Sequence, residues 1–164
     1  MSPLQLIIVV SIILLLLISG IVSLMATRDH QTRIMVEKTF AAFKGFVGNW
    51  TNISHHTVDS LSWQIKIGNQ KDTTLTATRT IYYKEDKISS DHLAINKANK
   101  TLYLRFLSEN DSLRETFTLK SFANGVAFFE NKQTARFAVF KVIDKDHYSF
   151  QTGEGNEWVF SRSK

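Results

Sequence analysis

The sequence predicts an all-β domain, an antiparallel up-and-down barrel of about eight to ten strands, preceded by a single transmembrane helix and a short amphipathic helix. Two observations predict it. The N-terminus holds an uncharged apolar run long enough to cross a bilayer. From residue 50 onward, apolar residues recur at every second position, in short runs separated by turn residues. We therefore divide the chain into residues 1–27, 28–47 and 48–164.

The first segment carries no charged side chain from Leu4 to Met25. A helix rises 1.5 Å per residue, so a run of this length spans the ~30 Å hydrocarbon core of a bilayer. The alternative is a cleavable secretory signal, which would have a basic start, a shorter apolar run and a small residue in place of Leu24. Residues 4–25 are therefore expected to contact the lipid bilayer as a retained anchor.

The charge distribution bears on sidedness and partners. Basic residues follow the span closely and none precedes it, so the positive-inside rule favours a cytoplasmic domain. A periplasmic or other extracytoplasmic domain stays open, because long domains cross membranes despite such charges. A net charge of +5 predicts contact with anionic lipid headgroups or with other subunits of a membrane complex. Nucleic acid is not expected, because the basic residues are interspersed with acids and match no binding motif.

Residues 28–47 are predicted to form the amphipathic linker helix. Val36, Phe40, Phe43 and Val47 recur at steps of four, three and four, which places them on one face of a helix. This apolar stripe is suited to plugging one end of the barrel. The membrane-spanning helix can continue into this segment without a break, because neither Pro nor Gly occurs from Ile21 to Lys44.

Strand periodicity is clear in the region that follows. Apolar side chains alternate with polar ones in the segment Leu61, Trp63, Ile65 and Ile67, as in a strand with one wet face. Asn124-Gly125 is the strongest hairpin signal, because a type I′ turn needs positive φ at both central residues. The short connections favour a meander of sequential neighbours. Further strands are expected at about 74–84, 87–95, 101–107, 114–122, 125–130, 135–143, 146–152 and 157–163.

Short motifs add a family resemblance. Gly48-Asn49-Trp50 resembles the G-x-W opening of the lipocalin superfamily, in which the tryptophan lies at the closed end of the barrel. The resemblance implies that a basic residue of the last strand, here Arg162, lies across the indole. Residues 46–163 are similar to a family of small bacterial lipocalin-like domains of unknown function. The matching motifs are Trp63 with Thr78-Arg79, Phe117-Thr-Leu119, Ala127-Phe-Phe-Glu-Asn131 and Glu157-Trp-Val-Phe-Ser-Arg162.

One segment departs from that family. Lys132 to Arg136 stands where the family usually carries a Pro-rich stretch with a His-Asp-Phe-Pro core, so any polar site formed there is absent or remodelled. No catalytic residue follows from the resemblance. The chain has no cysteine and matches none of the nucleotide-binding, hydrolase or metalloprotease patterns. We therefore expect neither an enzyme, nor a cofactor, nor a metal site.

Arg79 is the most informative ionisable residue. It shares a strand face with Leu75, and if that face points inward its guanidinium needs a carboxylate. A fatty-acid-like ligand would supply one. Alternatively, Arg79 pairs with Glu115 or Glu130, or the all-Thr face of its strand is the inner one. The tentative ligand-binding residues are Arg79, Trp63, Tyr83 and Phe117, and the residues expected to close the barrel are Gly48, Trp50 and Arg162.

Two functions follow for a single-pass membrane protein of this design. In the first, the barrel binds a small hydrophobic or lipidic ligand near the bilayer. In the second, the protein is an accessory or structural subunit of a larger membrane complex. The phenylalanines are numerous enough to fill a barrel of this size, which argues against a roomy cavity and supports the second function. We expect a partly filled barrel with a small pocket.

Overall fold

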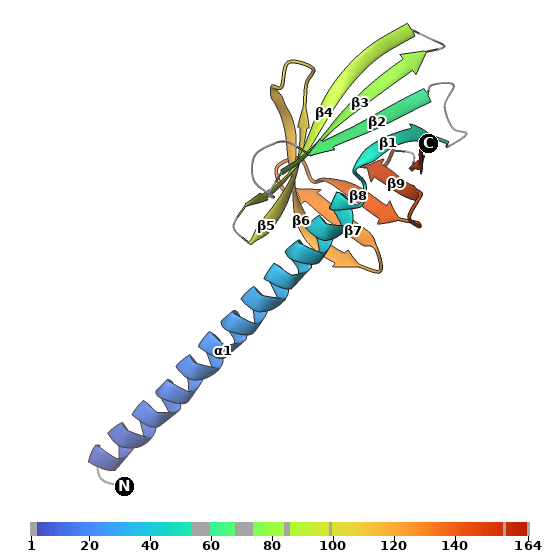
Figure 1. Cartoon of the computed structure of the whole chain (residues 1–164). Coiled ribbons are helices and arrows are strands. Elements are labelled where there is room, and N and C mark those ends of the chain that lie inside the picture. Colours follow the sequence, from blue (N-terminus) through green and yellow to red (C-terminus); the bar gives the residue numbers. More distant parts are fainter. Residues whose placement is uncertain are drawn as a thin grey trace. The chain divides into compact units, whose positions relative to one another are not determined.

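The computed structural model describes the backbone of residues 3–53, 60–67, 74–83, 86–98, 100–155 and 157–163, and no side chains of residues 3–6, 60–67, 81–83 and 86–89. One helix and ten strands are present in these ranges, labelled where space allows in Figure 1. They are α1 (Pro3–Lys44), β1 (Gly48–Asn52), β2 (Ser60–Ile67), β3 (Thr74–Tyr83), β4 (Asp86–Ala98), β5 (Thr101–Leu107), β6 (Leu113–Ala123), β7 (Val126–Asn131), β8 (Arg136–Val142), β9 (His147–Thr152) and β10 (Trp158–Arg162).

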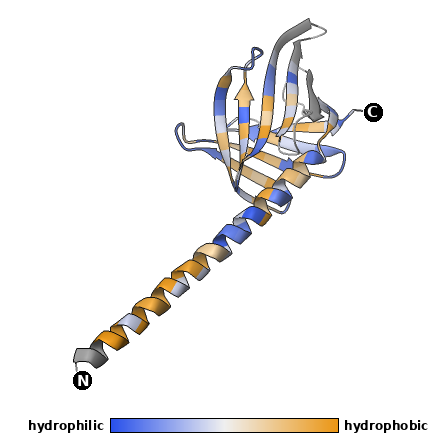
Figure 2. Cartoon of the chain, turned by 60° about the vertical axis from the view of Figure 1, so that its left-hand side comes forward, coloured by the Kyte–Doolittle hydropathy of each residue, from blue (hydrophilic) through white to orange (hydrophobic). Residues whose placement is uncertain are grey.

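The chain divides into two compact units, Met1–Ile34 and Met35–Lys164. The first consists of most of α1. Its large apolar side chains from Ile7 to Met25 are 40–73 % exposed, and Figure 2 shows this part of the helix as almost uniformly hydrophobic. By length and composition α1 is able to cross a membrane, a test that a signal sequence also passes. The predicted N-terminal apolar helix is confirmed, and it runs without a break into the predicted linker helix.

The second unit is built on one antiparallel sheet. Each strand pairs with its neighbour along the chain, as predicted for a meander. β1 pairs with β2 on one side and with β10 on the other, so the hydrogen-bonded order of the described strands returns to its start. Trp50 on β1 has Trp63 of β2 and Arg162 of β10 as its two cross-strand partners. The prediction of an all-β domain after an N-terminal helix is confirmed.

The β6–β7 turn confirms the hairpin prediction. Ala123 pairs with Val126, leaving Asn124 and Gly125 as a two-residue connection. Both central residues have positive φ, 50° at Asn124 and 75° at Gly125. A type I′ turn requires this, and asparagine and glycine adopt it at low cost.

The core follows the alternation of the strands. On β7, for example, Ala127 and Phe129 are buried while Phe128 between them is 36 % exposed. Phe117 of β6 and Leu104 of β5 are fully buried in the same core. The side chains of the alternating segment 61–67, from which a wet face was predicted, lie outside the described residues.

The C-terminal turns of α1 belong to this second unit. Val36, Phe40 and Phe43 are 2–3 % exposed, and Val47 packs against the same core. The predicted apolar stripe is therefore buried against the sheet. The Phe43 ring lies 5.0 Å from that of Phe140, measured between centroids and in an edge-to-face arrangement. Such aromatic pairs stabilise a core by ~0.5–1.5 kcal/mol beyond the burial of their area.

Candidate functional site

The chain enters its first strand through a tightly bonded corner. Trp50 is fully buried, and its indole Nε1 donates a hydrogen bond of 2.6 Å to the carbonyl oxygen of Phe46. The guanidinium carbon of Arg162 lies 4.4 Å from the centre of the Trp50 ring. Arg162 also donates from Nη1 to the Val47 carbonyl at 3.0 Å and from Nη2 to the Gly45 carbonyl at 2.8 Å. One arginine thus ties the last strand to the helix-to-strand turn, and its predicted contact with the indole is confirmed.

Gly48 lies at the centre of this corner. Its φ is +139°, a conformation that residues with a Cβ rarely adopt. A Cβ placed on Gly48 would lie 2.9 Å from Nη1 of Arg162. The glycine therefore allows both the turn and the close approach of the arginine.

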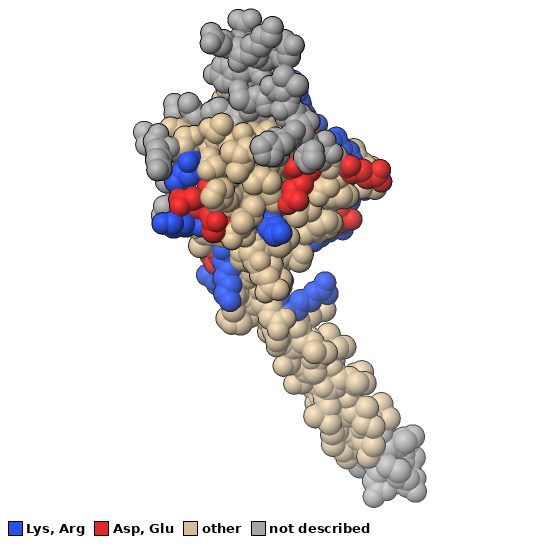
Figure 3. All heavy atoms as spheres, turned by 90° about the vertical axis from the view of Figure 1, so that its right-hand side faces the viewer, with Lys and Arg blue, Asp and Glu red and all other residues tan. Residues whose placement is uncertain are grey.

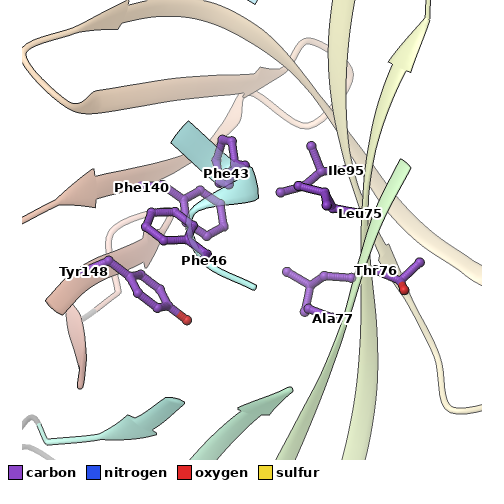
Figure 4. A pocket seen from close by; sticks show the side chains of 9 residues that line it. Phe43, Phe46, Leu75, Thr76, Ala77, Ile95, Phe140 and Tyr148 are labelled. Carbon is purple, nitrogen blue, oxygen red and sulfur yellow. The ribbon is translucent and has the colours of Figure 1, made fainter. Parts of the chain in front are cut away.

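The interior beside the helix is almost completely filled. Figure 4 shows the rings of Phe43, Phe46, Phe140 and Tyr148 on one side of a small cavity, with Leu75 and other aliphatic side chains of β3 and β4 opposite. The cavity measures about 20 Å³, and one water molecule needs ~10–15 Å³ in this measure. Burial raises the pKa of the Tyr148 hydroxyl well above its usual range. A ligand of any size does not fit here without displacing side chains.

A larger hollow lies where several strands begin or end. It measures about 320 Å³, and its lining includes the last residues of β5 and β9, Leu107 and Thr152, and the first residue of β8, Arg136. The small cavity, by contrast, is lined from the opposite ends of β3 and β9, by Leu75 and Tyr148. We call the larger one the open-end hollow. Its complete lining is Arg79, Asp91, Phe106, Leu107, Arg114, Glu115, Phe117, Arg136 and Thr152.

Arg79 lines this hollow. Leu75, on the same face of β3, is 3 % exposed and belongs to the core, whereas Thr76 is exposed, so the all-Thr face is not the inner one. Arg79 pairs through Nη2 with Oδ2 of Asp91 at 2.7 Å, and not with either glutamate considered from the sequence. The second oxygen of Asp91 forms an ion pair with Nη1 of Arg114 at 3.0 Å. One carboxylate thus bridges two guanidinium groups.

A second ion pair borders the hollow. Oε2 of Glu115 accepts from Nη1 of Arg136 at 2.8 Å, and Oε1 accepts from Asn131 and Thr134, each at 3.0 Å. Glu115 is 15 % exposed. Arg114, Glu115 and Arg136 also line a neighbouring hollow of about 360 Å³, formed with the β7–β8 turn. The Glu115–Arg136 pair therefore stands between two open depressions.

The apolar part of the open-end hollow is aromatic. Phe117 is fully buried and packs edge-to-face on Phe106 with 5.6 Å between ring centres. Phe106 in turn stacks on Phe150 at 6.1 Å. The hollow and the small cavity share none of their lining residues among the part of the chain that the structure describes.

The predicted ligand residues are only partly brought together. Arg79 and Phe117 line the same hollow. The backbone places Trp63 opposite Arg79 across β2 and β3, and Tyr83 opposite Asp86, but the side chains of Trp63 and Tyr83 lie outside the described residues. Sequence reasoning missed Asp91, Arg114 and Arg136. Arg136 ends the segment that departs from the family pattern, which was the available signal.

The described side chains of the hollow are charged, aromatic or aliphatic, apart from Thr152. Among the described side chains, no three His, Asp or Glu residues lie close enough together to hold a metal ion. His92 pairs through Nδ1 with Asp111 at 2.6 Å, at the β5–β6 turn. Comparison with protein-family models, with curated proteins and with solved structures finds no match. The lipocalin resemblance therefore stays a prediction from the sequence motifs.

Proposed function

We propose that this chain is a membrane-anchored, non-enzymatic, lipocalin-like barrel that binds a small hydrophobic or lipidic ligand near the bilayer. The observation that carries the proposal is the open-end hollow. Its volume of about 320 Å³ is at the lower end of the range typical of small-molecule pockets, ~300–1,000 Å³. Phe106 and Leu107, both partly exposed, supply apolar contact, and the charged residues of the lining supply a few polar groups that orient a ligand.

The position of the hollow defines how such a ligand binds. The interior beside α1 is filled by Phe43, Phe46, Phe140 and Tyr148, so the ligand does not replace the core of the barrel. It occupies the end at which β5, β6 and β8 turn. This is a shallower site than one running down the barrel axis, and it suits a ligand with a short apolar part.

A substitution that fills the hollow with a larger side chain tests the proposal. The full chain is extracted in mild detergent and examined by native mass spectrometry for a retained small molecule. Leu107→Trp places a larger side chain in the hollow and should abolish the retained mass. Leu113→Trp is the matched control, because Leu113 is 60 % exposed and does not line the hollow. Retention by Leu107→Trp equal to that of the unaltered chain, with both variants folded, would contradict the proposal.

A specific observation favours a second candidate function. The cavity of about 20 Å³ among the described side chains next to α1 suits a barrel that is packed as a structural module. As such a module, the protein would be an accessory subunit of a larger membrane complex. Affinity purification in mild detergent separates the two: a stoichiometric set of co-purifying chains with an empty hollow supports the accessory role, and a small-molecule ligand without partner chains supports the carrier.

The membrane side of the domain is part of the proposal. The basic residues after the span favour a cytoplasmic domain in contact with anionic headgroups. In the view of Figure 3, basic and acidic side chains are interspersed on the second unit, as on an ordinary solvated surface. Protease protection in sealed vesicles of known orientation tests sidedness. Cleavage from the cytoplasmic side only is expected, and complete protection there would place the domain on the other side.

A further inference from the structure

We propose that the open-end hollow selects a ligand carrying one negative charge, a monocarboxylate with a short apolar tail, and that the guanidinium groups of Arg79, Arg114 and Arg136 hold its carboxylate. This inference rests on the proposed function and adds the chemical class of the ligand. A neutral apolar molecule of the same length is the alternative that it excludes.

The charge of the lining is the first argument. The described residues around the hollow include three guanidinium groups, from Arg79, Arg114 and Arg136, and two carboxylates, from Asp91 and Glu115. Among these described side chains, the positive charges exceed the negative ones by one. Arg79 is 26 % exposed and Asp91 14 % exposed, whereas Arg114 is 60 % and Arg136 54 % exposed, so an anion would be screened less beside Arg79 than beside the two outer arginines.

The available donors are the second argument. A guanidinium carries five N–H groups, and Arg79 makes its ion pair through Nη2. Its Nε is buried and has no hydrogen-bond partner among the described atoms. Each oxygen of Asp91 forms an ion pair with an arginine, and both oxygens of Glu115 accept from neighbouring donors. The arginines of the lining thus have N–H groups left to donate, while the carboxylates of Asp91 and Glu115 already face donors. This favours a ligand group that accepts hydrogen bonds over one that donates them.

Asp91 shows that a carboxylate fits between these groups. Its two oxygens lie 2.7 Å from Arg79 and 3.0 Å from Arg114, each at hydrogen-bonding distance. A ligand carboxylate would bridge the remaining N–H groups of these arginines in the same way. Its apolar tail would then contact Phe106 and Leu107, which line the hollow and are partly exposed. One site thus offers contacts for both the carboxylate head and the apolar tail of the ligand.

The test compares two probes of equal chain length on the full chain in zwitterionic nanodiscs, with empty nanodiscs as the blank. Hexanoate carries the charge and 1-hexanol does not. We expect hexanoate to bind about tenfold more tightly, because charge-assisted hydrogen bonds are roughly twice as strong as neutral ones. Its affinity should fall as salt is raised, and that of hexanol should not. Calorimetry measures both.

Variants assign the effect to the hollow. Arg79→Gln should lower hexanoate affinity to about the level of hexanol, a loss of roughly tenfold. Arg114→Gln is a second variant that should fold in any case, since Arg114 is 60 % exposed, and it should lower the affinity in the same direction. Arg105→Gln is the matched control, because Arg105 is exposed and does not line the hollow.

The outcomes separate the two claims. Equal binding of hexanoate and hexanol, both lost in Leu107→Trp, would overturn the charge selection and leave the proposed binding function standing. Binding of neither probe would count against both. Hexanoate binding that Arg79→Gln and Arg114→Gln leave unchanged would overturn the assignment to these arginines.

Discussion

Replacing Phe43 by alanine tests the structural role of the last turns of α1. The Phe43 side chain is 2 % exposed, and its ring lies 5.4 Å from Phe46, 6.0 Å from Phe129 and 5.0 Å from Phe140 between centroids. These contacts join the helix to the sheet and to the entry of β1. Truncation would leave a cavity next to the existing one of about 20 Å³.

The magnitude follows from the burial. Truncation of a fully buried phenylalanine to alanine costs about 3–5 kcal/mol, from the lost apolar contact and the cavity that remains. For a domain of this size, 1 kcal/mol corresponds to a shift in melting temperature of about 4 °C. We therefore expect Phe43→Ala to lower the melting temperature by roughly 12–20 °C. Near-ultraviolet circular dichroism of the full chain in detergent follows the transition.

A matched substitution on the sheet surface provides the control. Phe128 stacks on Phe137 with 5.9 Å between ring centres, but its side chain is 36 % exposed. Phe128→Ala should therefore cost less than half as much as Phe43→Ala. Equal shifts in the two variants, or a shift of only a few degrees for Phe43→Ala, would show that the helix does not pack into the domain, and the reasoning on the buried stripe would be wrong.

Three further predictions concern the corner, the alkaline limit and the anchor. Gly48→Ala should destabilise the domain by more than about 1 kcal/mol in chemical denaturation, because φ is +139° and the Cβ would approach Arg162, whereas Gly20→Ala, where nothing lies within 4 Å, should be nearly neutral. Burial raises the pKa of Tyr148, so its contribution to stability is complete below the usual tyrosine pKa of ~10 and declines as the pH rises above it. The melting temperature of Tyr148→Phe should therefore fall less steeply above pH ~10 than that of the unaltered chain, and equal slopes would contradict this. Intact-mass measurement of the mature chain should find residues 4–25 present, and a mass lacking them would identify a cleaved signal.

Much of the fold could be predicted because it depends on local chemistry. Asn124 and Gly125 specify a two-residue turn through the φ values they tolerate, and the turn is where the sequence placed it. Phe43 falls on a helical stripe that only a neighbouring surface could bury, and it is buried. The contact of Arg162 with Trp50 was predicted from a motif and not from spacing, and the 4.4 Å separation confirms it.

The site was harder to predict because it depends on register. Arg79 and Asp91 are direct cross-strand partners on β3 and β4, a relation fixed by the pairing of two strands and by a bulge near Ile81. Nothing in the sequence specifies such a register to one residue, and a slip by one would turn every side chain to the other face. The sequence thus indicated that Arg79 needs a carboxylate, but not which one.

The mix of charges in the hollow also depends on long-range geometry. Arg114 and Arg136 lie twenty residues or more beyond Asp91 along the chain and meet at the hollow because β6 and β8 both begin at that end. Each alone is a common surface arginine at the start of a strand. Their grouping is a property of the strand order, which becomes visible only when the sheet is assembled.

The central claim is that a small anionic amphiphile binds at the open end of the strand ring and not in its interior. Site-resolved methyl NMR of the full chain in nanodiscs, titrated with hexanoate, tests this most directly. The account predicts the largest shift changes at Leu107, which lines the open-end hollow, with Leu75 and Ile95 beside the small cavity unchanged. Largest changes at Leu75 and Ile95 would contradict it.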